Sequence, residues 1–232
     1  MLVAALLILA GCAPRPLLER AIRARGGPLT GLVSRTEARV YVGAPGTWQS
    51  THALLVPDRY AWKIVTTADP LYHLFDGATA RSFVGTAEVS SDASPRAPLR
   101  SHARWTAAVN LDALRAPGVA IAPLPVADLP AGVHEGLLAI FPDGTGYRLG
   151  FDDHTLLVWA QGFLDFSPFG KGDVTARFGN HRRAGRLLLP LATSYFLGAT
   201  AIVDEKVLAV CVDPPGLTPA SFGDPAKLPD CP

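Results

Sequence analysis

The chain has 232 residues, of which 49% are hydrophobic, and its formal net charge at neutral pH is +1. This length is sufficient for one sizeable core and does not require two domains. Because the Lys and Arg residues are scattered and nearly balanced by acidic residues, we expect no nucleic-acid partner.

The first twelve residues have the pattern of an export signal. An apolar run over residues 2–9 is followed by Ala10, Gly11 and Cys12. Small residues let an extended segment enter a peptidase groove, and a thiol just after them can accept a diacylglycerol. The pattern resembles the lipobox of bacterial lipoproteins, and this resemblance implies that Cys12 is lipidated and becomes the first residue of the mature protein. A transmembrane helix is disfavoured, since it needs about 20 apolar residues.

These features predict a signal peptide over residues 1–11 and a lipidated tether over residues 12–16, followed by one domain. Acylation would anchor the protein to a membrane without spanning it. The segment carries no Lys or Arg before its apolar core, and it is shorter than the roughly 15–30 residues of most export signals. An upstream start therefore remains open.

Helical spacing of apolar residues predicts a helix over residues 17–25, ended by Gly26, Gly27 and Pro28. The period then changes to two, which indicates an antiparallel meander. We place its strands at residues 35–42, 48–56, 60–66 and 71–75. Residues 85–98 are rich in Ser, Ala, Asp and Pro, and they are predicted to form a surface loop.

A second helix is predicted over residues 101–115, with Ser101 as its N-cap, and a crossing loop over residues 122–132. Turn residues then separate six further strands, at residues 137–141, 147–152, 155–163, 172–178, 186–196 and 199–212. Because there is no βαβ rhythm, a doubly wound sheet is disfavoured. The predicted class is α+β, mostly antiparallel β, with one strongly curved sheet and two or three helices against one face.

Cys211 and Cys231 remain once Cys12 is assigned to lipid, and an even number in an exported chain predicts a disulfide between them. The bridge would close a loop of about 20 residues and stabilise the fold by roughly 3 kcal/mol. Two buried free thiols are the alternative. Metal binding is disfavoured, because neither residue has a His or Cys partner at ligand spacing.

Several segments together carry a resemblance to a known family. They are PDRYAWK at residues 57–63, LFDGATA at 74–80, YRLGFD at 147–152, the strand at 174–178, the turn ending at Gly185, LLP at 188–190, and VCVDP at 210–214 followed by Phe222. In their order and loop positions, these segments resemble the LolA-like periplasmic lipoprotein-sorting superfamily over about residues 17–225. We therefore expect residues 17–232 to form a single domain of the LolA/LolB type.

The resemblance implies a half-open, incomplete β-barrel, capped by helices, whose apolar cavity holds a lipid or the acyl chains of lipoproteins. Burial of each methylene would contribute about 0.8 kcal/mol. The candidates for lining the cavity are Trp48, Trp62, Phe75, Leu149, Phe151, Trp159, Phe178 and Leu189. Core packing is the alternative for each of them, because the face that each occupies depends on strand register.

An anchored member of this superfamily cannot shuttle between membranes, so the resemblance points to a LolB-like acceptor or a lipid-holding lipoprotein. Ala13 stands where an Asp would retain the protein at the inner membrane, which favours the outer membrane, facing the periplasm. Phe163, Phe166 and Phe169 lie in a segment bounded by Pro and Gly. They are candidates for contact with a membrane or an envelope protein, or for packing a hairpin onto the core.

No sequence motif of an enzyme is present: there is no G-x-S-x-G, H-E-x-x-H, P-loop or G-x-G-x-x-G. Asp152, Asp153 and His154 are interpreted as a solvated turn, and residues 181–183 as a cationic hairpin tip. We predict no catalytic residue, no metal and no cofactor. The alternatives are a structural or interaction lipoprotein with a filled cavity, and a hydrolase of unrecognised type.

Overall fold

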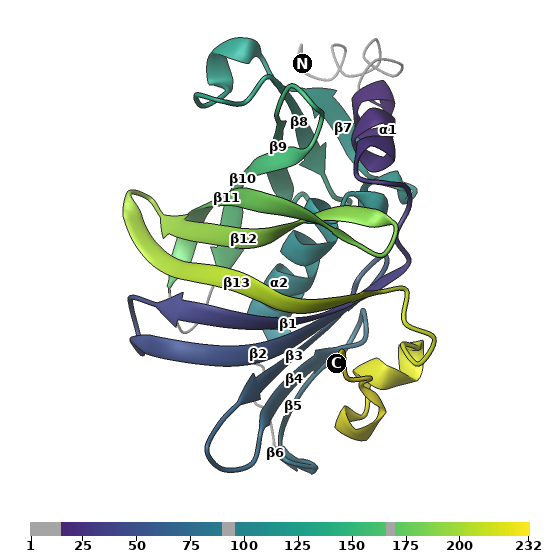
Figure 1. The fold of residues 1–232 in the computed structure, drawn as a ribbon, viewed down its shortest axis with the longest axis vertical. Helices are drawn as coiled ribbons and strands as arrows, with labels where there is room; N and C mark the ends of the chain where they lie inside the picture. Colours follow the sequence, from purple (N-terminus) through teal and green to yellow (C-terminus); the bar gives the residue numbers. More distant parts are fainter. Residues whose placement is uncertain (1–14, 90–95, 166–169) are drawn as a thin grey trace.

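The computed structural model describes residues 15–89, 96–165 and 170–232. In these ranges two α-helices pack with one antiparallel sheet (Figure 1). The helices are α1 (Arg15–Ala24) and α2 (Arg96–Val109), with four short 3-10 helices, η1 (Asp112–Arg115), η2 (Val126–Asp128), η3 (Pro219–Phe222) and η4 (Pro225–Lys227). The strands are β1 (Gly31–Val40), β2 (Gly46–Leu55), β3 (Arg59–Val65), β4 (Leu71–Phe75), β5 (Ala80–Val84), β6 (Ala87–Val89), β7 (Ala120–Pro123), β8 (Glu135–Ile140), β9 (Gly146–Phe151), β10 (Leu157–Asp165), β11 (Lys171–Ala184), β12 (Leu187–Leu197) and β13 (Thr200–Val212).

The sheet has thirteen strands among the described residues, in the order β6-β5-β4-β3-β2-β1-β13-β12-β11-β10-β9-β8-β7. Each half is a meander of sequence neighbours, and the pairing of β1 with β13 joins the two halves. Strands β6 and β7 are the two edges, so the sheet is not closed. The prediction of a mostly antiparallel sheet with helices on one face is confirmed.

Three short strands escaped the sequence analysis. Strand β6 lies within the loop predicted over residues 85–98, β7 overlaps the loop predicted over residues 122–132, and β5 precedes β6. All three lie at or next to an edge of the sheet. An edge strand is short, and it tolerates proline, as at Pro123, so its hydrophobic pattern is weak.

Several predicted boundaries are wrong. Helix α2 ends at Val109 and not at residue 115, and β1 begins at Gly31 and not at residue 35. Helix α2 begins at Arg96, so Ser101 is not an N-cap but lies inside the helix, where its hydroxyl accepts a hydrogen bond from the Asp165 backbone N–H at 3.1 Å. The early start is possible because Pro98 falls in the first turn, where backbone N–H groups lack helical partners. Strand β11 continues to Ala184, so residues 181–183 lie on a strand and not at a hairpin tip.

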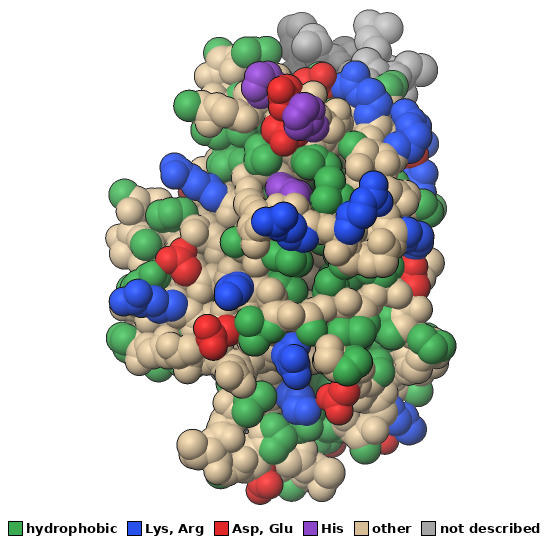
Figure 2. All heavy atoms as spheres, viewed as in Figure 1, with side chains coloured by type: hydrophobic (Ala, Val, Ile, Leu, Met, Phe, Trp, Pro, Cys, Tyr) green, Lys and Arg blue, Asp and Glu red, His purple; other side chains and the backbone are tan. Residues whose placement is uncertain are grey.

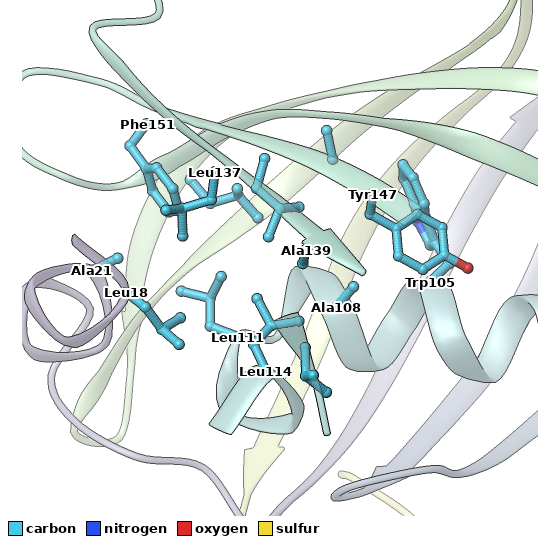
Figure 3. Close-up of a cluster of buried hydrophobic side chains, with 14 of the residues drawn as sticks. Leu18, Ala21, Trp105, Ala108, Leu111, Leu114, Leu137, Ala139, Tyr147 and Phe151 are labelled. Carbon is cyan, nitrogen blue, oxygen red and sulfur yellow. The ribbon is translucent and has the colours of Figure 1, made fainter. Parts of the chain in front are cut away.

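The main core fills the space between the two helices and strands β8–β11. Leu18 and Ala21 of α1 and Ala108 of α2 point toward strand residues such as Leu137 and Phe151 (Figure 3). Further along α2, the ring of Trp105 meets the ring of Tyr147 edge-on at 5.6 Å (both are labelled in Figure 3). This end of the helix-bearing face is closely packed.

The C-terminal segment covers the opposite face of the sheet. Val33 of β1 packs against Leu217 and Phe222, whereas its neighbour Ser34 faces α2, since successive side chains of a strand point to opposite faces. A disulfide joins Cys211 to Cys231, with their Cα atoms 5.7 Å apart, as predicted. The bridge holds the segment against the sheet.

A buried ion pair connects the end of α1 to the segment after α2. The guanidinium of Arg25 donates to the Asp112 carboxylate and to the carbonyl of Asn110, and the backbone N–H of Leu29 also donates to Asp112. The two side chains are only 7% and 5% exposed. The pair fixes the segment that leads into β1. Removal of one partner would be costly, because it would leave a buried charge unpaired.

Removing the disulfide should destabilise the fold without changing it. We expect Cys231→Ser to lower the free energy of unfolding by about 3 kcal/mol, because the unfolded chain regains the entropy of a 20-residue loop. Urea unfolding followed by circular dichroism measures the change. An unchanged midpoint would show that the bridge adds no stability.

Breaking the buried ion pair should cost more than breaking an exposed one. We expect Asp112→Ala to lower the free energy of unfolding by about 3–5 kcal/mol, because it leaves Arg25 charged and buried. Glu135→Ala, which removes the exposed pair with Arg20, is the control, with an expected loss below about 1 kcal/mol. Equal losses in urea unfolding would contradict this account.

Candidate functional site

Two adjoining cavities lie between the helices and the inner face of the sheet, with volumes of about 150 and 170 Å³. The larger, here called the glutamate cavity, lies under α2 and is lined by Leu32, Ser34, Thr36, Ala38, Val40, Trp48, Ser50, His52, Tyr60, Trp62, His102, Trp105, Thr106, Val109, Asn110, Tyr195, Val203, Glu205 and Val207. The smaller, here called the leucine cavity, is lined by Ala21, Arg25, Leu32, Ser34, Val109, Asn110, Leu111, Leu156, Leu157, Phe178, His181, Leu188, Leu189, Pro190, Leu191, Thr193, Tyr195, Val207 and Val210. The cavities are neighbours, since several residues line both.

The space exists because inward-facing residues at the centre of the sheet are small. Successive inward positions of β1 are Ser34, Thr36 and Ala38, and Ser50 of β2 and Thr193 of β12 face the same region. Ser34, Thr36, Ser50 and Thr193 are all buried. A sheet that packs fully against a helix would carry Leu, Ile or Phe at these positions. The small side chains therefore leave room below α2.

Aromatic rings form one wall of the glutamate cavity. The indole of Trp62 stacks on the imidazole of His52 from β2, with ring centroids 5.9 Å apart, and on that of His102 from α2, at 5.7 Å. Trp48 of β2 also lines the cavity. These contacts join α2 to strands β2 and β3.

A chain of polar groups crosses the floor of the same cavity. The hydroxyl of Tyr60 lies 2.8 Å from Nδ1 of His52, and Nε2 of that ring lies 3.2 Å from Oε1 of Glu205. With the proton on Nε2, Tyr60 donates to His52 and His52 donates to Glu205. The side chains of His52 and Glu205 meet above β1, because the small inward-facing residues of β1 leave room between them. Residues from β2, β3 and β13 thus form one network.

Burial and hydrogen bonding set the charges in this network. Burial raises the pKa of Glu205, but the hydrogen bond from His52, with the nearby hydroxyls of Thr36 and Tyr195, outweighs it and holds that pKa below its ordinary value. Glu205 is therefore a carboxylate at neutral pH. Burial lowers the pKa of His102 to about 4, so this imidazole is neutral at pH 7.

The leucine cavity has no acidic residue among its described lining residues. Leucine side chains from β12 and from the start of β10 surround it, together with Phe178 of β11. Two of its polar members are already engaged: Arg25 pairs with Asp112, and Nε2 of His181 lies 3.1 Å from the carbonyl oxygen of Leu157. This compartment suits an alkyl chain better than a polar group.

Four of the eight candidate lining residues border these cavities. Trp48 and Trp62 line the glutamate cavity, and Phe178 and Leu189 line the leucine cavity. The other four, Phe75, Leu149, Phe151 and Trp159, are buried elsewhere and are not among the residues that border the two cavities in the described chain. Leu149 and Phe151 belong to the core that α1 and α2 fill, Phe75 packs beside Leu99 of α2, and Trp159 lies against Gly150.

The remaining candidates concern the membrane. Phe163 is 54% exposed at the end of β10, where its ring contacts the ammonium group of Lys171. Cys12, Phe166 and Phe169 lie outside the described residues.

The sequence analysis missed the polar members of the site, His52, His102, Tyr195 and Glu205. One signal was available for Glu205: it interrupts the alternating apolar positions Val203 and Val207 of β13, where a charged side chain at an inward position is unusual. The histidines and the tyrosine carried no such signal, because they come from different elements.

No other cluster in the described chain offers obvious chemistry. Asp152 accepts hydrogen bonds from the backbone N–H groups of His154 and Leu156, so this segment is a turn, as interpreted from the sequence. No group of three or more His, Cys, Asp or Glu residues within the described ranges is placed to hold a metal ion. None of the helices described is long and apolar enough to span a membrane. On the face shown in Figure 2, Lys and Arg side chains are dispersed among acidic and hydrophobic ones.

Comparison with known proteins yields fold similarity only. No family model and no curated protein matches the chain. Among solved structures, a putative outer membrane lipoprotein-sorting protein domain from Vibrio parahaemolyticus superposes with a TM-score of 0.55 at 12% identity, covering 90% of this chain and 97% of that one. A LolA superfamily protein from Nitrosomonas europaea gives a TM-score of 0.56 at 10% identity, with coverages of 90% and 96%. The chain has a LolA-like fold.

A third solved structure extends this similarity. A DUF1329 family protein from Desulfovibrio piger superposes with a TM-score of 0.50 at 11% identity, covering 92% of this chain and 98% of that one. All three similarities span nearly the whole chain. At these identities the similarity concerns the fold alone, and any ligand must be argued from the cavities.

The neutral state of His102 should make stability depend on pH. The unfolded chain protonates this residue below about pH 6.5, whereas the folded protein protonates it only near pH 4. The contribution of neutral His102 to the free energy of unfolding is therefore complete above pH 6.5. It falls by about 2 kcal/mol between pH 7.5 and pH 5. Urea unfolding at both pH values should show a smaller loss for His102→Gln. His154→Gln, at a side chain 78% exposed, is the control and should keep the loss of the parent protein.

Proposed function

We propose that this protein is a membrane-anchored periplasmic lipoprotein that binds a lipid, or the acyl chains of lipoproteins, in sorting to the outer membrane. The observation that carries the proposal is the pair of adjoining cavities with largely apolar walls, which small residues leave between α2 and the sheet of a LolA-like fold. Apolar walls favour alkyl chains, because every methylene moved out of water lowers the free energy. On this account the protein is a binding protein and not an enzyme.

The proposal includes a sheet that acts as a half-open barrel, formed by one domain over residues 17–232. Two observations support it. The sheet has two unpaired edges, and α2 contacts β2–β5 in one half and β9 and β10 in the other. A helix that reaches both halves is expected where a sheet bends around it.

We further propose that Cys12 carries the lipid anchor and that residues 12–16 form the tether. Ala13 after the cysteine supports an outer-membrane location, facing the periplasm. The exposed ring of Phe163 supports a contact with the membrane or an envelope protein at the end of β10, to which Phe166 and Phe169 would contribute.

Cavity size favours one competing function. An apolar cavity of about 150 Å³ is large enough for benzene, so either cavity alone is smaller than a long acyl chain. A chain would have to occupy both or widen them by displacing α2. If it does neither, the protein is a non-catalytic structural or interaction lipoprotein whose barrel its own side chains fill.

Filling the cavities should abolish lipid binding and leave the fold intact. Ser34 lines both cavities, so Ser34→Leu places a branched apolar side chain at their junction. We expect the chain from Ala13 onward, purified from a periplasm without detergent, to carry a stoichiometric lipid in native mass spectrometry, and the variant to carry at least about tenfold less. Thr47→Leu, on the exposed part of β2, is the matched control and should retain the lipid.

Two results would decide against lipid binding. One is a ligand-free mass that does not change after incubation with phospholipids and acylated peptides. The other is equal lipid occupancy in Ser34→Leu and the unmodified protein. Anchoring is tested separately, since the full chain should incorporate labelled palmitate and Cys12→Ala should not.

A further inference from the structure

Glu205 is a feature that binding of acyl chains does not need. A charged group in a largely apolar cavity is costly unless hydrogen bonds compensate it, and an apolar residue would bind alkyl groups better. Glu205 nevertheless lies on the inward face of β13 between Val203 and Val207. Its charge is held by His52, with Nε2 3.2 Å from Oε1, and by the hydroxyl of Tyr195, and the hydroxyl of Thr36 lies nearby.

These neighbours do not use the full capacity of the carboxylate. A carboxylate offers about four acceptor positions, and one donor each from His52, Thr36 and Tyr195 occupies at most three of them. The side chain lines the cavity and keeps 18% of its surface accessible. One acceptor position therefore remains for a ligand that enters the cavity.

The other lining groups decide which ligand fits. Among the described residues around the glutamate cavity there is no Lys or Arg. A carboxylate or phosphate placed there would face Glu205 with no fixed cation to compensate it. An N–H or O–H group would instead complete the hydrogen bonding of Glu205, and a charged acceptor strengthens such a bond.

We propose that the glutamate cavity recognises the polar end of an amphiphile through an N–H or O–H donor, such as the amide of an N-acyl group, that hydrogen-bonds to Glu205. The alkyl chain then extends into the adjoining leucine cavity, and amphiphiles that end in a carboxylate or phosphate are rejected. This inference rests on the proposed function and specifies its ligand class.

The test uses three probes with the same ten-carbon chain: decanamide, methyl decanoate and decanoate. Affinities for the chain from Ala13 onward are measured by isothermal titration calorimetry at pH 7.4. We expect decanamide to bind at least about tenfold more tightly than decanoate, with methyl decanoate between them, because only the amide donates a hydrogen bond and only decanoate carries a charge.

Glu205→Gln should reduce the preference for decanamide over decanoate to within about threefold, mainly by improving decanoate binding, because the repulsion is gone. Asp204→Asn is the matched control. Asp204 neighbours Glu205 but points to the outer face, where it bonds to Tyr41 and Ser194, so the preference should not change.

The outcomes separate this inference from the proposed function. Equal binding of the three probes, or tighter binding of decanoate, by the unmodified protein overturns donor recognition and leaves alkyl binding standing. An unchanged preference in folded Glu205→Gln also overturns it. If none of the three probes binds, the proposed function fails, and this inference fails with it. The probe ranking of the unmodified protein decides the matter even if the variant does not fold.

Discussion

The pairing of β1 with β13 is the contact on which the rest of the structure depends. These strands lie about 170 residues apart in the chain, and in the described part of the sheet their pairing is the one link between its two meanders. It sets Glu205 opposite Ala38, and the side chain of Glu205 reaches diagonally across β1 to His52 of β2, whose own partner on β1 is Ser34. The register shift at Arg35 and Thr36 then lets Val207 and Val210 both face inward. The glutamate cavity and its polar network therefore both depend on the pairing of β1 with β13.

Packing density divides the inner face of the sheet into two regions. Below β8–β10 the strands carry Leu137, Leu149 and Phe151, and both helices press against them, so that region is solid core. Below β1, β2 and β12 the equivalent positions carry Ser34, Ser50 and Thr193, and α2 bridges a space that they do not fill. Such a division has a cost, because a void forfeits dispersion contacts. The presence of this void beside a compensated charge is the physical basis of the proposed binding function.

Much of the fold was predictable from local patterns, and the errors lie where the local pattern is weak or misleading. Helix α1, the central strands and the disulfide partners followed from hydrophobic period, turn residues and cysteine parity. Strands β5, β6 and β7 were missed because an edge strand has a single partner and needs little pattern. The start of α2 was misplaced because Pro98 reads as a helix breaker, although a proline in the first turn displaces no helical hydrogen bond.

The sequence by itself determined the class of fold, the order of its elements and the export and lipidation hypothesis, because these depend on neighbours along the chain. Only the tertiary structure decided which residues line a cavity. Trp48 and Phe151 are both large and on strands, yet one faces a space and the other lies in packed core, depending on what α1 and α2 cover. The contact between His52 and Glu205 joins residues more than 150 positions apart. It arises from strand register, which no local pattern specifies.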